Sequence, residues 1–116
     1  MSWGTVELEP EVTAWIDTLS KDDVASVAFY VDLLADTGVL LGEPFTRQLR
    51  RKLRELRFHL GSQQIRITYY IATGRRIVLL TVFTKSRQHE AAEIVRAYRQ
   101  MERCIAEGHT VEDEDE

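Results

Sequence analysis

Arginine dominates the middle of this sequence. Residues 47–103 contain twelve Arg, two Lys and only four acidic residues, whereas residues 1–46 hold nine acids and one Lys and residues 104–116 hold six acids. The formal charge of the whole chain is −4, so the excess of cations is confined to the middle segment. A guanidinium is planar, permanently charged and suited to bidentate contact with phosphate. The charge distribution therefore predicts a polyanion as a partner of this chain.

Few other side chains in the sequence suit catalysis. His89 is the histidine nearest to Lys85 and Arg87, and because imidazole titrates near neutral pH it is a candidate general base. Ser86 and Cys104 have no neighbouring base in the sequence, which argues against nucleophilic catalysis. The sequence shows no glycine-rich phosphate loop and no cluster of metal ligands, and one cysteine cannot form an internal disulfide. We therefore expect neither a cofactor nor a metal.

The length and composition indicate one globular domain. The chain has 116 residues, of which 44% are hydrophobic. Its longest nearly apolar stretch, from Ile77 to Phe83, is far shorter than the roughly 20 residues that span a bilayer, and no signal-peptide pattern opens the sequence. We expect a cytoplasmic protein without a membrane partner, with a single domain at 1–110 and a disordered acidic tail at 111–116.

Helical spacing characterises the first third of the chain. A short alternating segment at 3–8 predicts a strand, and apolar residues at helical spacing predict a helix that begins at Pro10. Ser20 followed by Asp23 is a plausible capping box for a second helix, which Gly38 should end. The short connection between them predicts an αα-hairpin.

Strand patterns follow the predicted hairpin. Residues 49–60 fit either a helix or a strand, and we favour a strand from about Leu53; residues 65–71 alternate clearly, and residues 77–83 are apolar on both faces. A last helix should end near Gly108. The order β-α-α-β-β-β-α predicts an α+β fold, with helices packed on an antiparallel-rich sheet. Alternation places Arg57 on one face with Glu55 and His59, and Arg54 on the other face.

Four segments of the chain resemble the RelE/HigB toxins of bacterial toxin–antitoxin pairs, including their phage-derived branch. They are LRELRF at 53–58, IRITYY at 65–70, RIVLLTVFTK at 76–85 and EIVRA at 93–97. The resemblance implies a RelE-like fold and a metal-independent, ribosome-dependent endoribonuclease that cuts messenger RNA. In such enzymes the ribose 2′-hydroxyl attacks the adjacent phosphate. The resemblance also implies a cognate antitoxin, which we expect to be a helix-turn-helix protein from a neighbouring gene.

The resemblance assigns phosphate-binding roles to two strands. Arg66 occupies the place where the family carries an arginine before an aromatic residue, and we expect it on the exposed polar side of its strand. Arg57 and Arg54 lie in the preceding motif and are further candidates for contact with RNA. A bulge would be needed for Arg54 and Arg57 to reach the same site.

The segment after the last strand supplies the remaining candidates. Many family members have two successive basic residues where this chain has Lys85 and Ser86, so Arg87 would replace the missing charge. His89 is the candidate base for the 2′-proton. Family members commonly place a Tyr or His in the last helix; Tyr98 could fill that role, although its helical spacing favours packing in the core.

Two other functions are compatible with the sequence. One is a toxin of the same fold group that poisons DNA gyrase without cutting RNA. The other is a noncatalytic module that binds nucleic acid or the ribosome through its arginines. Stacking aromatic residues would favour the module, and Tyr69 and Tyr70 lie among the arginines on opposite faces of their strand.

Overall fold

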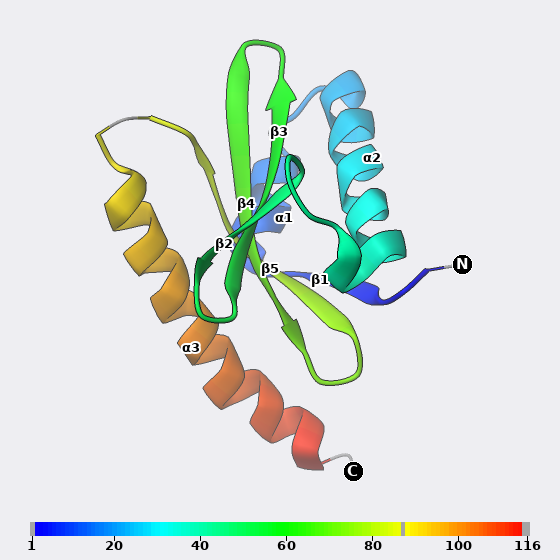
Figure 1. Ribbon diagram of the computed structural model, residues 1–116, viewed down its shortest axis with the longest axis vertical. Helices are drawn as coiled ribbons and strands as arrows, with labels where there is room; N and C mark the ends of the chain where they lie inside the picture. The colour runs from blue at the N-terminus through cyan, green and yellow to red at the C-terminus, as the bar shows by residue number, and fades with distance from the viewer. Residues whose placement is uncertain (1, 87, 115–116) are drawn as a thin grey trace.

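The computed structural model describes the backbone of residues 2–86 and 88–114, and the side chains of these residues up to Glu107. Figure 1 shows helices packed around a twisted sheet. The elements in chain order are β1 (Thr5–Leu8), α1 (Pro10–Ile16), α2 (Lys21–Thr37), a short 3₁₀ helix η1 (Gly38–Leu40), β2 (Thr46–Arg50), β3 (Leu53–Leu60), β4 (Gln63–Ala72), β5 (Arg76–Thr84) and α3 (Glu90–Glu114).

The sheet has five strands in the order β1-β5-β4-β3-β2. Strands β2 to β5 pair antiparallel with their neighbours, and only β1 pairs parallel, along β5. The α+β class and the antiparallel-rich sheet are therefore confirmed. The predicted element order lacks one strand, β2. Its sequence, TRQLR, carries a single large apolar residue because β2 is an edge strand, so the pattern that identifies strands is nearly absent there.

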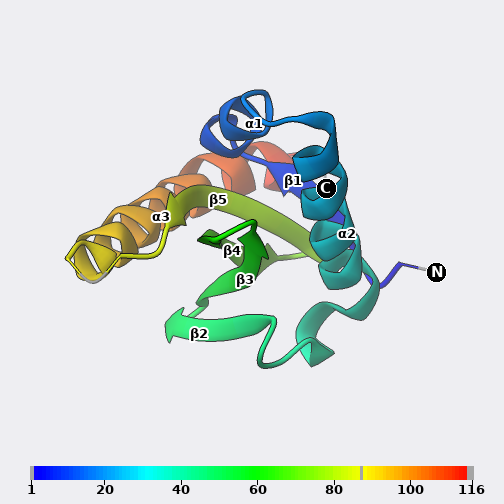
Figure 2. The ribbon, with the colours of Figure 1, turned by 90° about the horizontal axis from the view of Figure 1, so that it is seen from above.

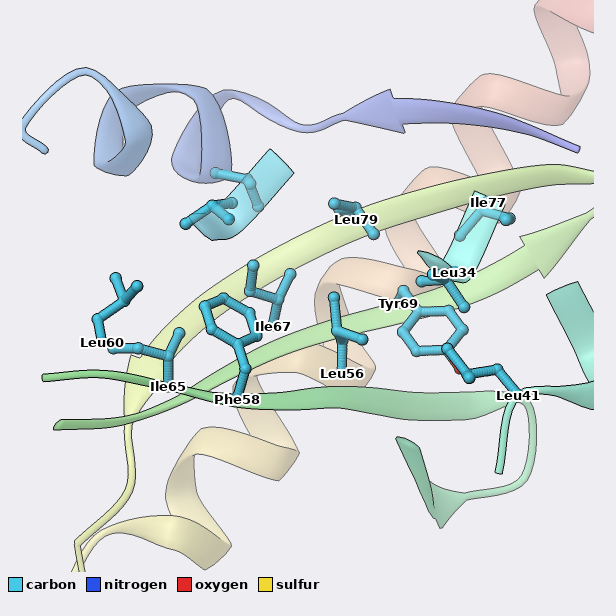
Figure 3. Close-up of a cluster of buried hydrophobic side chains, with 12 residues drawn as sticks. Leu34, Leu41, Leu56, Phe58, Leu60, Ile65, Ile67, Tyr69, Ile77 and Leu79 are labelled. Atoms are coloured by element: carbon cyan, nitrogen blue, oxygen red, sulfur yellow. The ribbon is translucent and has the colours of Figure 1, made fainter. Parts of the chain in front are cut away.

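Helices cover both faces of the sheet. The α1–α2 hairpin packs on one face and α3 packs on the other (Figure 1 and Figure 2). Figure 3 shows the larger of the two cores, in which Leu56, Ile67, Tyr69 and Leu79 from three strands face Leu34 of α2. The smaller core lies under α3 and includes Leu53, Tyr70, Val78, Leu80, Ala97 and Met101. Strand β4 is therefore buried on both faces, whereas the sequence predicted a half-buried strand.

The helical hairpin follows its predicted signals. Pro10 is the first residue of α1, and the Ser20 side chain accepts a hydrogen bond from the Asp23 N–H at the start of α2. Gly38 ends α2 with a φ of 61°, a conformation that favours glycine. A Cβ atom at Gly38 would also lie 2.1 Å from the Trp3 ring, so the close approach of the N-terminal segment requires glycine as well.

Strand β1 forms one edge of the sheet but covers only part of its neighbour β5. Strand β1 covers β5 only as far as Leu79, and beyond it the Glu11 carboxylate accepts a hydrogen bond from the Val82 N–H at 2.9 Å. The same carboxylate accepts from Arg96 of α3 at 3.0 Å. Glu11 therefore substitutes for a neighbouring strand and also joins α1 to α3.

The last helix is longer than the sequence predicted. It continues past Gly108, the expected end, to Glu114. The division into a domain at 1–110 and an acidic tail at 111–116 stays a prediction. Within the part of the chain that the structure describes, no helix is both long and apolar enough to cross a membrane.

Candidate functional site

Three charged side chains lie side by side on the α3 face of the sheet. Arg57 of β3 is paired in register with Arg66 of β4, and Glu55 lies two residues before Arg57 on the same face. The Glu55 Oε2 atom is 3.7 Å from the Arg66 Nε and 3.8 Å from the Arg57 Nε. Because Glu55 is fully buried and Arg66 is only 3% exposed, this is an internal charge cluster. Arg66 was expected on an exposed face, and that prediction is wrong, because its guanidinium lies against Glu55, the Ile65 carbonyl and Gln64 and not in solvent.

The cluster is short of hydrogen bonds. Neither carboxylate oxygen of Glu55 has a hydrogen-bond partner, and the same is true of the buried Nε atoms of Arg57 and Arg66. The Arg66 guanidinium donates instead to the Ile65 carbonyl and to Gln64 Oε1, each at 3.2 Å. Buried groups usually satisfy their hydrogen bonds, so the orphaned atoms mark this cluster as unusual.

Burial perturbs both charges. Desolvation raises the pKa of Glu55 above its ordinary value, and the nearby Arg66 and Arg57 charges only partly offset this effect. Desolvation also lowers the pKa of Arg66, while Glu55 opposes that shift. Two guanidinium groups share one carboxylate, so the cluster keeps a positive charge with which it can attract an anion.

Arg54 lies away from the other candidates. Its guanidinium donates to the Tyr69 hydroxyl at 3.3 Å and to Thr46 Oγ1 at 3.0 Å. Both contacts lie on the face that the helical hairpin covers, opposite Arg57, as strand alternation predicted. Arg54 therefore supports the packing between β2, β3 and β4 and does not join the charge cluster.

The segment after β5 lies beside the cluster. The Lys85 backbone N–H donates to the Gln64 carbonyl at 2.8 Å, and its side chain is exposed. His89 is exposed in the turn before α3, where its carbonyl accepts a hydrogen bond from the Glu93 N–H. The next residue, Glu90, is near enough to influence the pKa of Glu55. Arg87 lies outside the described residues, so its predicted role stays a prediction.

Tyr98 and Cys104 belong to the packing of α3. Tyr98 packs against the smaller core, and the Arg50 guanidinium lies 4.3 Å from its ring centroid. The Cys104 thiol donates to Glu9 Oε1 at 2.9 Å, and burial together with this contact raises its pKa to about 12. A thiol that resists ionisation is a poor nucleophile.

Sequence reasoning missed four residues that complete the site. Arg47 of β2 lies opposite Glu55 in register, Gln64 binds Arg66, and Tyr30 and Phe45 come from α2 and the loop before β2. These last two line a pocket of about 360 Å³ together with Arg57, His59, Gln64 and Arg66. The sequence of β2 does not show a strand pattern from which Arg47 could have been placed opposite Glu55, and no signal in the sequence links α2 to this edge of β3.

Comparison with solved structures gives the same fold. A chain of the toxin–antitoxin complex RelBE2 from Mycobacterium tuberculosis superposes with a TM-score of 0.55 at 18% identity, covering 71% of this chain and 98% of the other. A double mutant of the Escherichia coli toxin RelE in the free state has a TM-score of 0.58 at 13% identity, covering 89% and 98%. No curated protein matches the sequence.

A family comparison covers most of the domain. Residues 14–102 match the family described as phage-derived protein Gp49-like (DUF891). The matched range contains the charge cluster and nearly the whole sheet. The chain therefore belongs to the Gp49-like family of phage-derived proteins, a RelE/HigB-type toxin family.

Proposed function

We propose that this chain is the toxin of a toxin–antitoxin pair and that it cuts messenger RNA on the ribosome. The observation that carries the proposal is the pair of guanidinium groups, Arg57 and Arg66, beside a fully buried carboxylate and a pocket at the edge of the sheet. The RelE-like fold and the family membership support it. An anion attracted to this cluster would meet charges that are already held in position, which favours stabilisation of a charged transition state.

The proposed reaction is attack of a ribose 2′-hydroxyl on the adjacent phosphate. Arg57 and Arg66 would bind the phosphate oxygens and stabilise the negative charge that develops on them. Lys85, and Arg87 by the sequence prediction, would hold the flanking backbone. His89 is the proposed base, and its exposed position before α3 leaves it accessible to a bound strand. The ribosome would align the RNA for the attack.

The proposed partners follow from charge. The excess of cations at residues 47–103 suits RNA, and it also suits an acidic segment of an antitoxin that covers the same surface. One of the similar structures is a toxin–antitoxin complex. We propose that a helix-turn-helix antitoxin from a neighbouring gene neutralises this chain in the cytoplasm.

Primer extension on RNA from cells that express the chain tests the proposed activity. We expect cuts inside translated coding sequences, and we expect His89→Ala to remove them at an equal soluble level. Gln88→Ala is the matched control, because Gln88 is the exposed neighbour of His89 and has no proposed role in the site. Growth arrest with intact messenger RNA would contradict the nuclease and favour gyrase poisoning or noncatalytic binding.

A further inference from the structure

Two chemically distinct kinds of side chain line the pocket beside the charge cluster. The apolar and aromatic lining includes Pro44, Phe45 and Tyr30, and the Tyr30 ring stacks on Phe58 with centroids 4.9 Å apart. The polar lining comes from Arg57 of β3 and from Gln64 and Arg66 of β4. Its volume of about 360 Å³ is within the range of small-molecule sites.

The pocket lies beside the part of β3 that extends beyond its neighbouring strand, β2. Strand β2 pairs with β3 from Leu53 to Leu56, and the Arg57 N–H still donates to the Phe45 carbonyl at 2.8 Å. Figure 1 shows the β3–β4 hairpin extending beyond β2. Peptide groups alternate in direction along a strand, so the N–H and C=O of His59 point to this uncovered edge. Among the described residues, no hydrogen bond to either group is found.

Gln64 presents a further donor to the pocket. Its Oε1 atom accepts from Arg66, and this contact leaves the amide N–H groups of Gln64 free to turn toward a ligand. The pocket therefore combines an aromatic and apolar surface with a backbone donor, a backbone acceptor and a side-chain donor. Single-stranded RNA is recognised through this combination, by stacking of an unpaired base and hydrogen bonds to its edge.

We propose that the pocket binds one unstacked nucleobase of RNA, next to the phosphate that Arg57 and Arg66 bind. This inference rests on the proposed function, because it takes RNA as the substrate. The base would lie against Phe45 and Pro44, and its edge would meet Gln64 and the His59 peptide groups. The pocket would then determine base preference, whereas the guanidinium groups would bind any sequence.

Fluorescence anisotropy with labelled tetraribonucleotides tests this proposal. The probes are tetrauridylate, tetraadenylate and a tetramer of the same length without bases, all at low salt. We expect at least one base-containing tetramer to bind on the order of tenfold more tightly than the abasic tetramer, as one stacked base allows. Phe45→Ala and Gln64→Leu should each reduce this ratio toward one.

Gln63→Leu is the matched control, because Gln63 is the exposed neighbour of Gln64 and does not line the pocket. If Phe45→Ala unfolds the domain, Gln64→Leu alone decides, since Gln64 is exposed and, among the described residues, its side chain hydrogen-bonds only to Arg66. Equal binding of all tetramers, or an unchanged affinity ratio in Gln64→Leu, would overturn the proposal that the pocket binds a nucleobase. Equal binding is also the result expected if the pocket binds a peptide strand instead. If cellular RNA is cut but tetramer binding does not depend on the base, the proposed nuclease activity stands and only the proposed nucleobase pocket is refuted.

Discussion

Replacing Arg66 by Ala should destabilise the domain strongly. Glu55 and Arg66 are both almost fully buried, and Glu55 Oε2 lies 3.7 Å from the Arg66 Nε. At an effective dielectric constant of about 20, two unit charges at that distance attract by about 4.5 kcal/mol. Removing one partner of a buried pair costs about 3 to 5 kcal/mol, because the other charge stays buried. Arg57 remains beside Glu55, so we expect a loss of about 3 kcal/mol.

Urea denaturation followed by tryptophan fluorescence measures this loss. Arg47→Ala is the control, because Arg47 lies on the same face but is exposed, and its loss should stay within about 0.5 kcal/mol. The double variant Glu55→Leu with Arg66→Met removes both charges and should unfold within about 1 kcal/mol of the parent. If Arg66→Ala is as stable as Arg47→Ala, the attraction in the cluster has been overestimated. If the double variant is as unstable as Arg66→Ala, lost packing and not charge explains the effect.

Three further predictions follow from burial and hydrogen bonding. Burial raises the pKa of Glu55 in the folded state above its ordinary value of 4.5, so the folded state keeps a proton that the unfolded state releases. The free energy of unfolding should therefore fall as the pH rises from 4.5 toward the raised pKa. Urea denaturation across this pH range should show a smaller fall for Glu55→Gln. Arg96→Ala breaks exposed ion pairs and should lower the free energy of unfolding by less than about 1 kcal/mol in the same assay. Glu11→Ala also leaves the Val82 N–H of β5 without its acceptor and should lower the free energy of unfolding by about 1 to 3 kcal/mol. Cys104, with a pKa raised from 9.0 to about 12, should hold roughly 1000-fold less thiolate than a free thiol at pH 8, so a disulfide reagent should label it slowly until urea unfolds the chain.

Alternation in the sequence was enough to assign the faces of β3. It separated Arg54 from Arg57 correctly, because side-chain direction in a strand depends only on residue parity. It gave the wrong environment for Arg66, because parity says which face a residue occupies but not what covers that face. The polar residues of β4 resemble a solvent-facing row, yet Arg66 and Thr68 are buried under the α3 side.

The nucleobase pocket shows a second limit of sequence reasoning. Tyr30 and Phe45 follow helical and loop patterns that indicate only local packing, and their meeting with β3 depends on how the hairpin docks on the sheet. Alternation placed Glu55 on the same face of β3 as Arg57, but its complete burial is a tertiary property. Local pattern therefore predicted the α-helices, the strands other than β2 and the side-chain directions on β3, whereas the depth and shape of the site depend on how the layers assemble.

The parallel pairing of β1 with β5 has a consequence for the order in which the chain folds during synthesis. Thr5 is paired with Arg76, about 70 residues later, and translation at about 5 to 20 residues per second needs about 4 to 14 s to produce that partner. During this interval β1 has no strand to bind, and the α1–α2 hairpin lacks most of the sheet that it covers. A nascent chain halted before β5 should therefore be digested rapidly by protease, and resistance should arise only after the β5 segment has been made.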